Sequence, residues 1–161
     1  LVELRFESTL FVQSTRFDAF LQDSRLGEEI RQQVDAGDAS EEVESSTNVV
    51  RLPLKAKLLD NVTLSSRVIT PNGDLANDEL RLDLDLTNVL SPRPVRVSLY
   101  DLAGHRVWTE QQLISAGQHS FSWRGERSDG ALAPPGLYLL ELQVIGDARQ
   151  ETVRRTVAVA Y

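Results

Sequence analysis

Three strings within residues 70–142 decide the fold: TPNGDLANDEL at 70–80, VRVSLYDLAGHRV at 95–107 and AGQHSFSWRGERSDGALAPPGLYLLEL at 116–142. In each string, short stretches of alternating apolar and polar residues are interrupted by Gly, Asn, Asp and Pro. Such alternation is typical of half-buried strands, and these four residue types favour chain reversal. The strings therefore predict an antiparallel β-sheet protein.

The clearest strand is ELRLDLDLT, where every second residue from Leu80 to Leu86 is leucine and the residues between are charged. Similar patterns predict strands at 62–69, 94–102, 105–114, 118–125, 138–144 and 149–161, with a tight hairpin turn at 101–104. Phe121 and Trp123 fall on one face, which we expect to be buried. Seven short strands separated by turns predict an all-β fold, an immunoglobulin-like or fibronectin-III-like β-sandwich at 61–161.

Residues 1–60 predict a smaller and partial β unit. Its first strand is expected at 2–12, with Val2, Leu4 and Phe6 on one face. LGEEIRQQV at 26–34 has apolar residues at helical spacing and predicts a short helical turn, and the acidic, serine-rich stretch 35–48 predicts an exposed loop. A sheet this small has a thin core, so we expect it to pack on the second unit, on the rest of a larger sandwich or on a neighbouring molecule.

Composition excludes several classes of function. The net charge of −7 disfavours nucleic acid as a partner, since phosphate binding needs a concentrated basic face. The absence of cysteine excludes disulfides and thiolate chemistry, and the apolar runs are too short to span a membrane. The sequence also lacks methionine, even at position 1, and we therefore expect it to be part of a longer precursor.

The turn sequences resemble those of bacterial secreted proteins over about residues 62–161. TPNGDLANDEL resembles the opening of gliding-motility-associated and sorting-type C-terminal immunoglobulin-like modules. The later strings are similar to the immunoglobulin-like domain of the flagellar hook-capping protein family. That family shows a YDxxGxxV hairpin, a WxG turn and a PxGxY strand start, which are here Tyr100–Val107, Trp123–Gly125 and Pro134–Tyr138. One departure is Leu75, which stands where the motif usually has its second glycine, so we expect a somewhat different turn there.

The resemblance implies a module of exported or surface-attached proteins, located outside the cell or on its surface. It implies no catalytic residue and no cofactor. The partners it implies are proteins, either other copies of the chain or the cell-surface and secretion machinery.

One oxygen-rich cluster is the best candidate for a metal site. Its members are Asn72, Asp74, Asn77, Asp78 and Glu79. Calcium takes six to eight oxygen ligands from such loops, although the spacing is not that of an EF-hand. The alternative is a group of Asx-turns, in which these side chains bond to their own backbone, and the sequence favours this second interpretation.

Other chemistry-bearing residues are more simply explained by structure. His105 and His119 accompany no nucleophile motif, and we expect both at the surface. Asp83 and Asp85 alternate along the wet face of a strand rather than facing a cleft. Trp108 is in phase with Arg106, so we expect it to be exposed and to be a contact residue.

These features lead to one main hypothesis and one alternative. The main hypothesis is a non-enzymatic extracellular structural module for anchoring, sorting or self-assembly. A sharper form makes the chain a fibre subunit whose N-terminal strand adds to an open sheet edge of a neighbour. The alternative is an accessory module of a secreted enzyme that binds carbohydrate or calcium.

Overall fold

The computed structural model describes residues 6–23, 25, 30–34, 48–52, 57–146 and 149–161. All regular elements in these ranges are strands, and none of these residues forms a helix that could cross a membrane. The chain separates into two compact units, Val12–Leu54 and Leu1–Phe11 with Lys55–Tyr161. The sequence-based division between residues 60 and 61 stays a prediction about which parts fold independently.

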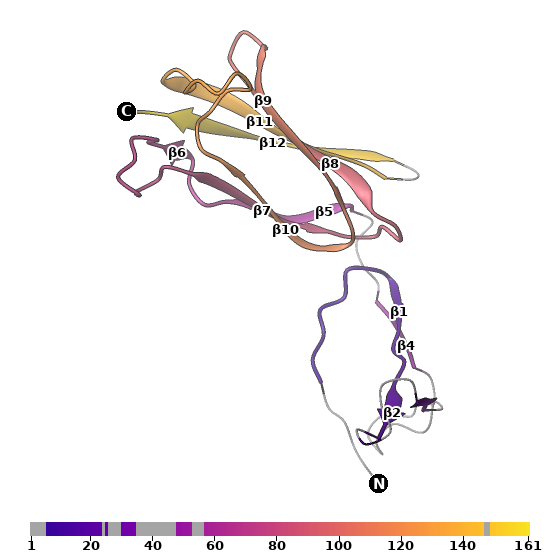
Figure 1. The fold of residues 1–161 in the computed structure, drawn as a ribbon. Helices are drawn as coiled ribbons and strands as arrows, with labels where there is room; N and C mark the ends of the chain where they lie inside the picture. The colour runs from indigo at the N-terminus through magenta and orange to yellow at the C-terminus, as the bar shows by residue number, and fades with distance from the viewer. Residues whose placement is uncertain (1–5, 24, 26–29, 35–47, 53–56, 147–148) are drawn as a thin grey trace. The chain divides into compact units, whose positions relative to one another are not determined.

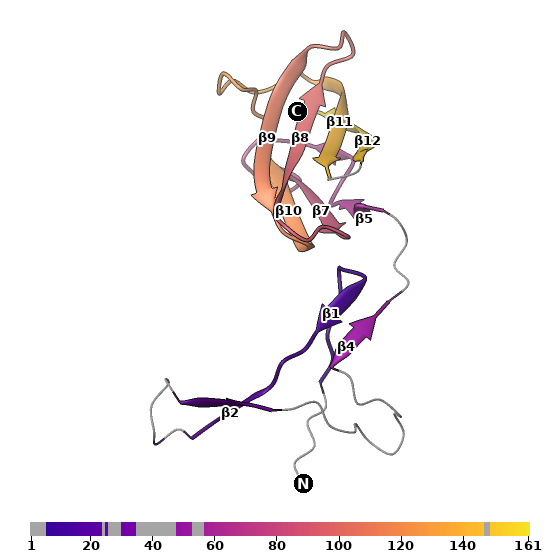
Figure 2. The same cartoon turned by 90° about the vertical axis from the view of Figure 1, so that its right-hand side faces the viewer.

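The larger unit is a sandwich of two sheets, which confirms the predicted immunoglobulin-like fold class (Figure 1). One sheet has the order β10 (Gly117–Trp123), β7 (Leu80–Leu86), β5 (Leu59–Leu64), and all its neighbours are antiparallel. The other has the order β6 (Val68–Ile69), β12 (Gln150–Val159), β11 (Gly136–Ile145), β8 (Arg93–Tyr100), β9 (Arg106–Ile114). Figure 2 shows the order β10, β7, β5 in one sheet and β12, β11, β8, β9 in the other, with β9 and β10 at the borders of their sheets.

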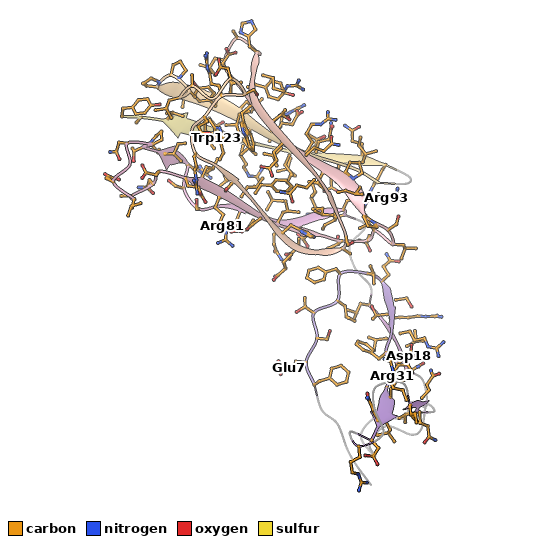
Figure 3. The ribbon with its side chains drawn as sticks, viewed as in Figure 1. Glu7, Asp18, Arg31, Arg81, Arg93 and Trp123 are labelled. Atoms are coloured by element: carbon orange, nitrogen blue, oxygen red, sulfur yellow. The ribbon has the colours of Figure 1, made fainter. Side chains whose placement is uncertain are left out.

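The core lies between the two sheets and follows the alternation of the sequence. The leucines of β7 are buried, and the intervening Arg81, Asp83 and Asp85 face solvent. Trp123 lies between the sheets, whereas Arg81 points away from them (Figure 3). Each fully buried leucine stabilises the fold by about 1.5–3 kcal/mol relative to an exposed one. The predicted burial of Phe121 and Trp123 is confirmed.

The stretch predicted as one strand at 62–69 is two strands in different sheets. β5 pairs with β7 in the three-stranded sheet, and β6 runs parallel to β12 in the five-stranded sheet. Between them, the Ser66 hydroxyl donates to the Val68 carbonyl at 2.7 Å. Serine side chains that hydrogen-bond to nearby backbone favour such breaks in a strand. Because the predicted strand is divided in two, the sandwich has eight strands rather than seven.

The smaller unit consists of two short strand pairs. β1 (Ser14–Arg16) pairs with β4 (Val49–Arg51), and β2 (Phe20–Gln22) pairs with β3 (Arg31–Gln33), both antiparallel. None of its described residues is buried, which agrees with the thin core expected from the sequence.

Two sequence-based expectations in the first sixty residues are wrong where the structure describes them. The helical turn predicted at 26–34 is instead strand β3 at Arg31–Gln33, because cross-strand pairing with β2 overrides a weak helical spacing. The strand predicted at 2–12 is absent from its described part, residues 6–12. Residues 26–29, 35–47, Val2 and Leu4 lie outside the described residues.

Candidate functional site

The loop between β6 and β7 holds the oxygen-rich cluster, and Asp78 lies at its centre. The Asp78 carboxylate accepts backbone N–H groups from Asn72 and Gly73 at 2.9 Å and from Leu75 at 2.8 Å. These hydrogen bonds, that of Gly73 foremost, hold the pKa of the Asp78 carboxyl below its ordinary value of 3.8. Because an ionised carboxylate is the stronger acceptor, Asp78 fixes the loop in its charged form.

The neighbouring side chains repeat this pattern. The Asn72 side-chain oxygen accepts the Asp74 N–H at 3.0 Å, and the Asp74 carboxylate accepts the Ala76 N–H at 2.8 Å. These are Asx-turns, the alternative that the sequence favours. The Asn77 carbonyl accepts the Thr70 N–H at 2.8 Å, which closes the base of the loop.

Glu79, the last of the five candidate ligands, lies apart from the Asp78 network. Its carboxylate accepts from the Arg124 guanidinium at 3.1 Å. Among the described residues, no three His, Asp or Glu side chains are grouped as a metal centre. Calcium binding at this loop stays a prediction, and the geometry shows that its oxygens already serve as acceptors for the backbone.

Leu75 in the same loop has a left-handed backbone conformation, with φ of 68°. Its side chain is 94% exposed, so no packing compensates for the strain. The left-handed region is the one that glycine favours. Leu75 therefore adopts the backbone conformation that glycine would have at this position of the motif, at the cost of strain. In this conformation its N–H donates to Asp78.

Both histidines serve local structure. In the hairpin between β8 and β9, the Asp101 carboxylate accepts the His105 N–H at 2.8 Å and lies 3.1 Å from the His105 ring Nδ1. These contacts lower the pKa of Asp101, with the His105 backbone bond as the largest cause. His105 is exposed as expected, whereas His119 is half-buried and donates from Nε2 to the Ser115 carbonyl at 2.7 Å.

The solvent face of the three-stranded sheet carries a shallow polar hollow of about 570 Å³. Arg81 and Asp83 on β7 form an ion pair at 2.8 Å, and the Ser120 hydroxyl on β10 donates to Asp83. The hydrogen bond from Ser120 is the largest cause that holds the pKa of Asp83 below its ordinary value, and Arg81 lowers it further. Asp85, also on this face, accepts from the Asn61 side chain. The sequence located these carboxylates on the wet face, but their partners depend on strand register.

Trp108 is half-buried and packs against the core, so the expectation that it is exposed is wrong. Its ring centroid lies 6.4 Å from that of Trp123, which in turn lies 6.1 Å from Tyr138. The cause is a bulge in β9, where Trp108 pairs with Leu99 but Arg106 pairs with Tyr100. One extra residue reverses the phase of the strand, which turns Trp108 inward.

The remaining interface residue is Phe6, whose side chain is 69% exposed. Its predicted role in an interface stays a prediction, as do those of Val2, Leu4 and Trp108.

Comparison with known proteins finds one family that is similar to the larger unit. The sequence of residues 76–148 matches the FlgD Ig-like domain family, which confirms the resemblance to hook-capping immunoglobulin-like domains. A search of curated proteins finds no match.

Several solved structures are similar to this chain. Dimeric latent PorU from Porphyromonas gingivalis matches with a TM-score of 0.51 and 16% identity, over 72% of this chain and 11% of PorU. FlgD from P. aeruginosa matches with a TM-score of 0.43 and 24% identity, over 65% of this chain and 76% of FlgD. A β-glucuronidase from Parabacteroides merdae matches with a TM-score of 0.42 and 18% identity, over 63% of this chain and 13% of the enzyme. The chain thus spans about a tenth of the length of PorU.

Proposed function

We propose that this chain is a non-enzymatic structural module of a secreted or surface-attached bacterial protein, which works through protein–protein contacts in anchoring, sorting or self-assembly. The observation that carries the proposal is that the main polar clusters of the sandwich hydrogen-bond within the fold. Asp78 and Asp101 accept backbone N–H groups of their own turns, and Asp83 pairs with Arg81 and Ser120. Each cluster stabilises a turn or a sheet face through hydrogen bonds to backbone or to neighbouring side chains.

The FlgD Ig-like domain match at 76–148 supports the same proposal. A sandwich of this kind is a rigid frame whose turns and sheet borders are available for contacts. The acidic chain, with a net charge of −7, suits a partner with a neutral or basic surface.

Location in the native bacterium tests this proposal. An epitope inserted after Leu90 of the parent protein should leave the sandwich intact, since Leu90 is 92% exposed and lies between β7 and β8, outside the strands. Antibody labelling of intact cells, or recovery of the epitope in the medium, is the expected result. Labelling that appears only after the cells are lysed would refute an extracellular role.

A carbohydrate-binding accessory module is the second candidate, favoured by the polar hollow on the three-stranded sheet. Asn61, Asp85 and Gln118 line the hollow with groups that hydrogen-bond hydroxyls, but no Phe, Tyr or Trp side chain lines it for sugar stacking. Titration of the chain with cell-wall oligosaccharides, followed by amide NMR shifts at these residues, tests it. Shifts that are lost in Asp85→Ala would support it, and an unchanged spectrum would remove it.

A further inference from the structure

The backbone of β7 shows which groups of β10 face out of the sheet. Arg81 directs both of its backbone groups toward β5, because its N–H donates to the Ser65 hydroxyl at 3.0 Å and its carbonyl accepts the Ser65 N–H at 2.8 Å. Along a regular strand, successive residues direct their backbone groups to opposite sides. The even-numbered leucines of β7 therefore bond to β10.

The pairing of β10 with β7 determines which backbone groups of β10 point away from the sheet. Leu82 lies opposite Phe121 and Leu84 lies opposite His119. Phe121 and His119 thus bond to β7, while the backbone groups of Gln118, Ser120 and Ser122 point away from the sheet. We call these three residues the β10 edge. All three are exposed, and no backbone hydrogen bond from elsewhere in the described chain reaches them.

The β10 edge lacks the features that protect sheet borders. β10 contains no proline, lysine or other charged residue that would oppose strand pairing, and its register with β7 is unbroken. β9, at the border of the other sheet, is protected in three ways: a bulge, the charged Glu110, and Ser128, whose N–H bonds to the Val107 carbonyl at 2.9 Å. Of these two border strands, β10 is therefore the one that is open to an added strand.

Apolar side chains lie beside the β10 edge. Phe121 and Trp123 of β10 are buried on its inward face, and the half-buried Trp108 of β9 has its ring centroid 6.4 Å from that of Trp123. A strand added to β10 would direct every second side chain toward these aromatic rings. These aromatic rings therefore favour an added strand with apolar residues at alternate positions.

We propose that the β10 edge accepts residues 2–8 of a second copy of this chain as an added strand. In sequence, this segment alternates Val2, Leu4 and Phe6 with Glu3, Arg5 and Glu7. Its apolar side chains would lie on the face of the sheet that carries Phe121 and Trp123, and its charged ones would lie in solvent. It is as long as β10, which has seven residues. This inference rests on the self-assembly form of the proposed function and names the surfaces used.

The two surfaces differ, and this determines the kind of assembly. A segment at one place and an acceptor edge at another make a head-to-tail contact, which continues into rings or open chains of subunits. A pair of β10 edges would instead make a closed dimer. The proposed contact thus predicts a series of oligomers rather than a dimer alone.

Sedimentation and light scattering of the complete chain over a concentration range test the inference. Wild type should form a concentration-dependent series of oligomers, and a variant lacking residues 1–8 should be monomeric. Ser122→Pro removes an outward N–H at a border position that tolerates proline, and should weaken association about tenfold or more. Gln111→Pro, on the border strand β9, is the matched control and should assemble like wild type.

Hydrogen exchange on wild type gives a readout that needs no variant. Backbone amides of Gln118, Ser120 and Ser122 should exchange fast in the monomer and slowly in the oligomer. A chain that stays monomeric, a closed dimer that survives deletion of residues 1–8, or assembly without protection of these amides would overturn the inference. None of these results bears on extracellular location, which the epitope experiment measures separately.

Discussion

Replacing Leu75 with glycine should stabilise the protein. Leu75 has a φ of 68°, a conformation that costs a residue with a Cβ atom about 1–2 kcal/mol. Its side chain is 94% exposed, so its removal sacrifices almost no buried surface. Its N–H bonds to Asp78 at 2.8 Å, and glycine keeps that bond.

The expected size of the effect is the released strain minus the greater freedom of glycine in the unfolded chain. That freedom costs about 0.4–1 kcal/mol. With middle values for both, the free energy of unfolding should rise by about 0.5–1 kcal/mol, which corresponds to a Tm increase of about 1–4 °C in a chain of this size. Urea unfolding followed by circular dichroism and a thermal scan both measure it.

Two controls isolate the backbone effect. Leu75→Ala keeps the Cβ and hence the strain, and should change the unfolding free energy by less than about 0.5 kcal/mol. Leu90→Gly removes a side chain that is 92% exposed, at a residue without positive φ, and should destabilise by about 0.4–1 kcal/mol. The reasoning fails if Leu75→Gly destabilises as Leu90→Gly does, or if Leu75→Ala stabilises as much as glycine.

Three further predictions concern the same sandwich. Gly125→Ala should destabilise by about 2 kcal/mol or more in urea unfolding, because φ is 77° and an added Cβ would lie 2.8 Å from the Pro71 Cγ atom; wild-type stability would contradict the close approach. Tyr138→Phe should cost about 0.5–1.5 kcal/mol in the same assay, since its hydroxyl donates to the Pro134 carbonyl at 2.6 Å; an unchanged midpoint would show that this bond contributes nothing. Asp78 has a lowered pKa, so its contribution to stability is present above the ordinary carboxyl value and is lost as pH falls through the lowered one. Asp78→Asn should therefore lower Tm at pH 7 and flatten the decline of Tm between neutral and acid pH, and an acid decline identical to that of wild type would contradict this role.

The sequence predicted the strands of the sandwich well where alternation was strict. In β7, leucine at every second position left only one way to bury the strand, and the structure has that burial. In β12, within the strand predicted at 149–161, the alternating Val157 and Val159 are likewise buried. The hairpin turn at 101–104 also formed where expected, closed by the bond from the Asp101 N–H to the His105 carbonyl at 3.0 Å.

Trp108 shows why the rest could not be predicted. Its orientation depends on one extra residue in β9, and bulges leave little signal in a single sequence. The bond between Ser120 and Asp83 could not be predicted for a similar reason. The two residues are 37 positions apart in sequence and become neighbours only through the register of β10 with β7. In the first sixty residues the short apolar stretches carry no strong period, so a strand at 31–33 resembled a helical turn.

Photo-crosslinking on intact cells tests the central claim most directly, namely that the chain is a surface module that works through protein contacts. The parent protein would carry a photoreactive side chain in place of Ser122 on the β10 edge. The account predicts an adduct that protease added outside the cells digests, and whose crosslinked peptide comes from residues 2–8 of a second copy. The absence of any protein adduct, or an adduct shielded from external protease until the cells are lysed, would contradict it.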